Sequence, residues 1–229
     1  MLTVGLLALA WVTDTAELGV LGLFYASVSA LPLVHGLTTP GVLYGNNSAT
    51  GFAQIAAVPL GLILAGPLIL PRRVQRVAGL IVWKCWVSAG ISVVVLVSAA
   101  LLIWPNTFVA PTPRSPVAVT VIVTSLVGLI ILALRHLRLA RIAQSPLPLA
   151  MSAGYGLVGS SVAMWVLAKP SAAGWWLRHL FDLPGVSVAT VAAIIILGRA
   201  SSVRETASAA LVIDPLAALE LGLDPVVHH

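Results

Sequence analysis

The chain has 229 residues, of which 59% are hydrophobic and 8% are charged, with a formal net charge of +5 and a mean hydropathy of +1.07. Soluble globular domains carry about 25% charged residues, so the few charges here cannot cover a soluble surface of this size. The composition excludes a soluble enzyme, a nucleic-acid-binding module and a disordered tail. It predicts an all-α fold, a polytopic bundle of transmembrane helices in a lipid bilayer.

Long runs without charged residues locate the predicted spans, because a helix needs roughly 20 apolar residues to cross the hydrocarbon core. The charge-free run from Leu18 to Pro71 is divided by turn-forming residues around Pro40-Gly41 and Gly45–Ser48. The last span is expected to follow a kink or a re-entry near Pro184-Gly185. The six predicted spans lie near Glu17–His35, Phe52–Leu70, Gly79–Ile103, Val117–Leu134, Leu147–Ala168 and Leu180–Leu197.

The N-terminal segment Met1–Val12 is apolar but too short to cross alone. It is the end of a longer helix that begins before this Met, a short tilted span or an interfacial segment. We therefore expect six or seven spans.

Basic residues gather in short clusters between the apolar runs, and by the positive-inside rule these clusters predict orientation. If the six spans alternate, three clusters share one side, and the other side keeps Arg114, Lys169 and Arg178. The arginine-rich side is predicted to be the cytoplasmic side of an inner (plasma) membrane, with the C-terminus inside. The clusters are Arg72, Arg73 and Arg76; Arg135, Arg138 and Arg141; and Arg199 and Arg204.

Two domains are expected, a transmembrane bundle over 1–198 and a cytoplasmic juxtamembrane connector over 199–229. In the connector, Asp214-Pro215 and Asp224-Pro225 each combine an N-cap residue with proline at the first helical position. The second of these helices has barely begun at His228-His229. We expect a truncated fragment of a longer protein, with purification-tag residues or a frayed natural tail as alternatives.

A candidate site is predicted at the end of the bundle opposite the arginine clusters. The outer loop before the last span combines aromatic and charged side chains, and the loop after the first span adds polar ones. Together they can roof a cavity for a small amphipathic or anionic ligand, and an aromatic belt of interfacial anchors is the alternative. The candidate ligand-binding residues are His35, Thr38, Tyr44, Trp175, Trp176, Arg178, His179 and Asp182.

His35 is the most suggestive of these residues, because it can contact a ligand or a metal ion near the outer end of its span. A zinc or haem site would need His179 or Asp182 as a partner, since His136 lies on the opposite side. A histidine without a spaced partner is a weak metal signal, and a helix-capping histidine is the alternative. We predict no metal site and no cofactor.

Catalytic motifs are missing from the sequence, which has no His-Glu-x-x-His, Gly-x-Ser-x-Gly, P-loop or nucleotide fingerprint. We therefore do not expect an enzyme. No predicted span has an acidic residue at its centre, which argues against proton-coupled transport. Asp14 and Glu17, at the cytoplasmic mouth of the first span, are expected to form ion pairs with Lys84 and with the cluster of Arg72, Arg73 and Arg76.

Small residues repeat every four positions at Ser152, Gly156 and Ser160, on one face of the fifth span. Such a face lets two helices approach closely. Close packing inside the bundle is the favoured interpretation, and a homodimer that forms through these residues is the alternative.

Two segments resemble the membrane regions of bacterial signalling proteins. They are His35–Leu43 and Leu216–His228, and the second includes the motif Leu219–Pro225. The high usage of Ala, Val, Leu and Gly is similar to that of actinobacterial proteins. In this group a multi-span N-terminal module precedes a cytoplasmic output domain, often an HD-GYP phosphodiesterase or a nucleotide cyclase. The resemblance implies a sensor half with such a domain as its partner. Because the HD-type metal ligands are absent, it implies no phosphodiesterase activity for this chain.

These observations favour an integral membrane sensory or anchoring module, which passes a signal from an outer site through 199–221 to an output domain. A small-solute permease or channel is the first alternative, and a structural subunit of a membrane complex is the second.

Overall fold

The chain folds almost entirely into helices in a computed structural model that describes residues 2–14, 16–69, 72–112, 114–143, 146–167 and 172–199. The described part contains no strand, only one isolated bridge between Pro40 and Tyr44. The all-α prediction is therefore confirmed for these residues. The helices are α1 (Leu2–Thr13), α2 (Ala16–Thr38), α3 (Ala49–Leu64), α4 (Gly66–Ile69), α5 (Arg72–Ile103), α6 (Pro116–Ala143), α7 (Pro146–Leu167) and α8 (Ala172–Arg199).

Four helices are long and apolar enough to cross a membrane, which supports a membrane-embedded protein. Their candidate spans are Ala16–Thr38, Trp83–Ile103, Pro116–Ile142 and Pro146–Trp165. These match the predicted first, third, fourth and fifth spans. The count of six or seven spans is not reproduced among the described residues.

The predicted second span is not one helix. α3 ends at Leu64, and the short α4 begins at Gly66. Pro67 has no backbone N–H and disfavours the helical conformation of the residue before it. The chain leaves the helix at Ala65, two residues before this proline, whereas Pro32, Pro59 and Pro184 lie inside helices. The apolar run near Phe52–Leu70 therefore becomes a 16-residue helix followed by a single turn.

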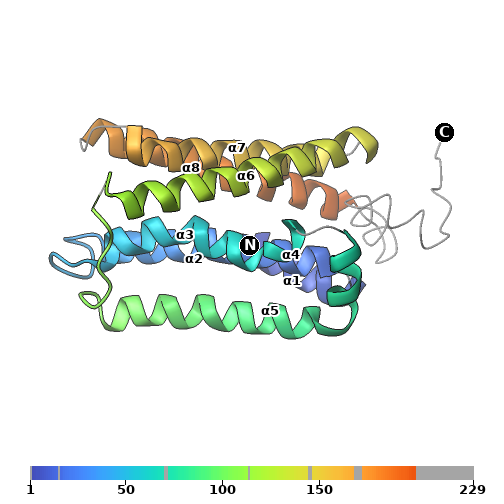
Figure 1. The fold of residues 1–229 in the computed structure, drawn as a ribbon, viewed down its shortest axis with the longest axis horizontal. Helices are drawn as coiled ribbons and strands as arrows, with labels where there is room; N and C mark the ends of the chain where they lie inside the picture. Colours follow the sequence, from blue (N-terminus) through green and yellow to red (C-terminus); the bar gives the residue numbers. More distant parts are fainter. Residues whose placement is uncertain are drawn as a thin grey trace.

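The helices form two layers whose axes lie close to parallel (Figure 1). The first layer contains α1 to α5, in which α2 makes its closest contacts with α1, α3 and α5. The second layer contains α6, α7 and α8, in which α7 packs against both neighbours. Contacts between the layers are sparser than contacts within them.

The two ends of the bundle differ in charge. At one end α6 carries Arg135, Arg138 and Arg141 in its last turns, and α5 begins and α8 finishes at the same end (Figure 1). We call it the arginine end. The other end carries the α2–α3 connection (residues 39–48) and the α5–α6 connection, and we call it the cavity end. The structure thus brings the predicted arginine-rich segments to one end; Arg204 lies outside the described residues.

Ion pairs at the arginine end include both acidic residues named from the sequence. Lys84 Nζ lies 2.8 Å from Asp14 Oδ1 on an exposed surface of the first layer. Glu17 of α2 pairs with Arg135 of α6, and Arg135 also donates to the carbonyl oxygen of Leu68. The Glu17–Arg135 pair therefore joins the two layers.

Next to this pair, the space between the layers is filled by a hydrophobic core. Phe24 and Tyr25 of α2 are buried against Tyr155 of α7, with ring centroids 5.4 Å apart for Phe24–Tyr155 and 6.4 Å for Tyr25–Tyr155. Leu129 and Leu132 of α6 complete this core. Burial of such side chains is the main favourable contact between the layers, because dispersion forces accumulate over many atoms.

Candidate functional site

A cavity of about 460 Å³ separates the two layers near the cavity end. Its walls come from α2 and α3 in the first layer and from α6, α7 and α8 in the second. Most of the lining is apolar, and a few polar side chains converge on it, which is the usual composition of a small-molecule site. These include Ser29, His35, Gln54, Ser125, Ser161, Arg178, His179 and Asp182.

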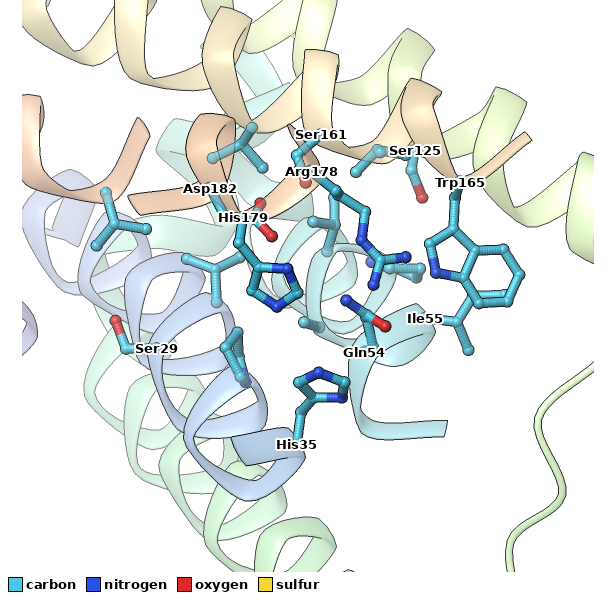
Figure 2. Close-up of a pocket in the computed structure, with 18 of the residues that line it drawn as sticks. Ser29, His35, Gln54, Ile55, Ser125, Ser161, Trp165, Arg178, His179 and Asp182 are labelled. Carbon is cyan, nitrogen blue, oxygen red and sulfur yellow. The ribbon is translucent and has the colours of Figure 1, made fainter. Parts of the chain in front are cut away.

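His35 lies in the last turns of α2 and faces the cavity (Figure 2). Its Nδ1 atom lies 2.8 Å from the carbonyl oxygen of Thr50 in α3. A carbonyl oxygen only accepts hydrogen bonds, so Nδ1 carries the proton of this bond. The Nε2 atom is buried and has no hydrogen-bond partner. One nitrogen thus fixes the ring, and the other is presented to the cavity.

Three ionisable residues of α8 face His35 across the cavity. The rings of His179 and His35 stack with centroids 5.8 Å apart and an interplanar angle of 26°. Asp182 accepts a hydrogen bond from the Ser161 hydroxyl and lies close to Arg178. The Nε atom of Arg178 is buried and has no hydrogen-bond partner. Figure 2 shows the side chains of Arg178, His179 and Gln54 directed into the space above His35.

The prediction of a loop at Trp175–Asp182 is wrong. α8 begins at Ala172 and continues through Pro184 to Arg199, so these residues form its first turns and no re-entry occurs at Pro184. The physical reason is amphipathic spacing. Residues three and four apart share a helix face, and Arg178 and His179 lie four and three residues before Asp182, so a helix directs all three toward the cavity.

Four of the eight predicted ligand-binding residues line the cavity, namely His35, Arg178, His179 and Asp182. Thr38 does not line it; its hydroxyl donates to the carbonyl oxygen of Val34 at 2.8 Å within α2. Tyr44 also lies away from it, and its hydroxyl donates to the Leu102 carbonyl oxygen at 2.7 Å.

The tryptophans predicted for the site are not part of the described cavity lining. Trp176 lies on α8 with its side chain 67% exposed. Trp175 also lies on α8, but its side chain falls outside the described structure. The exposed position of Trp176 is typical of an interfacial anchor, the alternative interpretation given above.

Sequence reasoning missed several cavity residues. Gln54, Ser125, Ser161 and Trp165 line the cavity, each from an apolar helix. A single polar residue within an apolar run gives no spacing signal, since only the tertiary arrangement shows where it points. Gln54 gave the one usable clue, because it lies in the first turn of a predicted span, where an amide is costly unless it finds a polar partner.

A metal centre is not formed by the described residues. No three His, Cys, Asp or Glu side chains in this part of the chain are close enough together to hold a metal ion.

Comparison with known proteins gives no match, whether the chain is compared with protein-family models, with curated proteins or with solved structures. The function must therefore be argued from the cavity itself.

Proposed function

We propose that this chain is a membrane-embedded sensory module that binds a small ligand in the cavity between its two layers. The observation that carries the proposal is the convergence of His35, Arg178, His179 and Asp182 on an otherwise apolar cavity. Ionisable groups are costly within a membrane protein and usually mark functional sites. Two of them, His35 and Arg178, keep buried polar atoms without protein partners, which a ligand would satisfy.

The two-layer arrangement supplies a route for the signal. A ligand that contacts α2 and α3 on one side and α8 on the other changes the free energy of bringing the layers together. A ligand shifts a conformational equilibrium only as far as it binds the two states differently. A small change at the cavity end would then alter the spacing of α5, α6 and α8 at the arginine end. In the proposed orientation this end is cytoplasmic and continues into the connector and an output domain.

The sensor hypothesis can be tested with spin labels at the arginine end. Cys85 is the chain's one cysteine and is exposed on α5, so an Arg141→Cys variant adds a second label on α6 in the other layer. Double electron–electron resonance in lipid nanodiscs would measure the distance with and without a panel of amphiphiles and small anions. We expect a ligand-dependent shift that Arg178→Met abolishes and Tyr44→Phe, outside the cavity, preserves. An unchanged distance for a ligand that binds would contradict signalling.

A permease is the second candidate, because the cavity lies between two helix layers with sparse mutual contacts. Alternating access in transporters moves one helix group against another around a central site. Reconstituted vesicles distinguish the two functions. Saturable uptake of a bound solute favours the permease, whereas binding and a distance change without uptake favour the sensor.

A further inference from the structure

The cavity lining changes along the helix axes: the side chains of its outer half are more polar, whereas most of those in its deeper half, which we call the apolar half, are valines, with Ser29 and Ser161 beside them. His35, Gln54 and Arg178 line it near the cavity end, where α2 finishes and α3 and α8 begin. Val28 and Val158 line it about two turns deeper, toward the core. A ligand with one polar head and an apolar chain would place its head at His35 and its chain toward the middle of the bundle. Amphiphiles in the adjacent membrane leaflet have this same orientation.

The cavity also reaches the surface between α2 and α8. Ser29, Pro32 and Gly36 of α2 line the cavity and are exposed. Leu183 of α8 lines it from the other side and is 70% exposed. In a membrane-spanning bundle, exposed positions at this depth face lipid. The opening therefore connects the cavity with the bilayer, where amphiphiles are concentrated.

The polar end requires a head group that supplies a proton. Nδ1 of His35 donates to Thr50, so in the neutral ring the unpartnered Nε2 is an acceptor. The unpartnered Nε–H of Arg178 is a donor. An acid head group satisfies both, because one oxygen accepts from Arg178 and the acidic proton lies between Nε2 and the other oxygen. Asp182, close to Arg178, disfavours heads with more than one negative charge.

We propose that the ligand is a single-chain amphiphile with a monobasic or singly ionised acid head group, taken from the bilayer through the opening between α2 and α8. The head binds His35 and Arg178, and the chain fills the apolar half between Val28 and Val158. This inference rests on the proposed binding function.

Calorimetry on the full chain in nanodiscs tests the proposal, with empty nanodiscs as the background. The probes are fatty acids of increasing length, decyl phosphate, methyl decanoate and methylphosphonate. We expect saturable binding of decanoic acid that, expressed against the free concentration of the acid in water, tightens about fourfold per added methylene until the apolar half is full. Methyl decanoate, which has no acidic proton, should bind at least about tenfold more weakly. Tighter binding of decyl phosphate than of decanoic acid would identify the head as a phosphate monoester.

A matched pair of variants tests the role of His35. Asparagine in place of His35 keeps a donor near the Nδ1 position for the Thr50 carbonyl but removes Nε2, so His35→Asn should reduce the difference between acid and ester. Tyr44→Phe should leave that difference unchanged. Because the acid–ester comparison also runs on the unaltered chain, the proposal stays testable if His35→Asn fails to fold.

The possible results distinguish failure of this inference from failure of the proposed ligand-binding function. If methylphosphonate binds and the affinity for fatty acids does not depend on their chain length, the ligand is not an amphiphile, but the chain is still a ligand-binding module. Equal affinity for acid and ester would overturn the acid head alone. If no probe binds above the background, the inference and the proposed binding function both fail.

Discussion

At the arginine end the two layers are joined by an ion pair and a filled core, whereas at the cavity end they are held apart by a cavity lined with polar side chains. Glu17 and Arg135 tie α2 to α6, and Tyr155 packs against Phe24. Across the cavity the rings of His35 and His179 stack, but His35 and Arg178 retain unpartnered atoms there. One half of the interface between the layers therefore stabilises the fold, while the other half keeps polar atoms that are available to bind a ligand. Binding sites commonly trade stability for function in this way.

The largest effect is expected where the layers are tied. The side chains of Glu17 and Arg135 are 22% and 20% exposed. Arg135→Met removes this partner from Glu17 and from the Leu68 carbonyl, and because the pair is half-buried the cost should lie between that of an exposed and that of a buried pair, at about 2–3 kcal/mol. Reversible unfolding in mixed micelles should show this loss, and Glu17→Gln in the same chain should restore part of it.

Lys84→Met is the control, because the Lys84–Asp14 pair is 47% and 69% exposed and joins helices of one layer. It should cost less than about 1 kcal/mol. If Arg135→Met and Lys84→Met reduce the free energy of unfolding equally, the Glu17–Arg135 pair between the layers stabilises the fold no more than an exposed pair does.

A second prediction concerns close packing of α7 against α8 within the second layer. A Cβ atom on Gly185 would lie 3.1 Å from the Val158 backbone nitrogen and 3.2 Å from the Gly154 carbonyl oxygen. These backbone atoms cannot move aside, so Gly185→Leu should destabilise by about 1–3 kcal/mol.

Gly156→Leu is the matched control for Gly185→Leu. A Cβ atom on Gly156 would have no neighbour within 4 Å, while Ser152 donates to the Ala133 carbonyl oxygen at 2.9 Å. The face of Ser152, Gly156 and Ser160 is therefore only partly used inside the chain, and the homodimer stays a prediction. Gly156→Leu should leave monomer stability unchanged. Its effect on the mass measured by light scattering tests the homodimer.

The helices could be predicted from the sequence because charge and apolar length act locally. The predicted span Glu17–His35 corresponds to α2 at Ala16–Thr38, and the predicted start of the fourth span at Val117 lies one residue from the start of α6. The break at Ala65 was missed, although Pro67 lies two residues further on, because the run on both sides is equally apolar. Local composition thus locates a helix better than it locates an interruption.

The cavity could be predicted only in part. His35 and Arg178 stand out because a polar group beside a membrane span has a cost that suggests a role. Ser125 and Ser161 do not, because a serine satisfies its own hydroxyl within a helix, as Ser125 does with the Val121 carbonyl oxygen at 2.7 Å. Which face of each helix lines the cavity depends on how the two layers pack, and the sequence of a single segment does not determine that packing.

The third prediction has the opposite sign from ordinary truncation. The hydroxyl groups of Tyr155 and Tyr25 are buried next to each other between the layers, and neither makes a hydrogen bond of normal geometry. A poorly satisfied buried polar group costs free energy, so Tyr155→Phe should stabilise the chain by up to about 1 kcal/mol. Tyr44→Phe removes a hydroxyl that donates to Leu102 at 2.7 Å and should destabilise by about 1 kcal/mol. Thermal unfolding of the two variants should therefore shift in opposite directions; shifts of the same sign would show that the two tyrosine hydroxyls form a stabilising hydrogen bond.

The smallest change in stability is expected at the cavity end, where the effect on binding should be largest. Arg178→Met keeps an apolar side chain of similar length and removes a buried Nε–H without a partner, and Asp182→Asn in the same chain avoids leaving the nearby carboxylate without its counter-charge. The free energy of unfolding should stay within about 0.5 kcal/mol of the unaltered chain or rise. Binding of decanoic acid should fall at least about tenfold, because a hydrogen bond to a charged group contributes more than one between neutral groups. A marked loss of stability in this variant would mean that Arg178 holds the layers together, and the contrast between a structural end and a binding end would no longer stand.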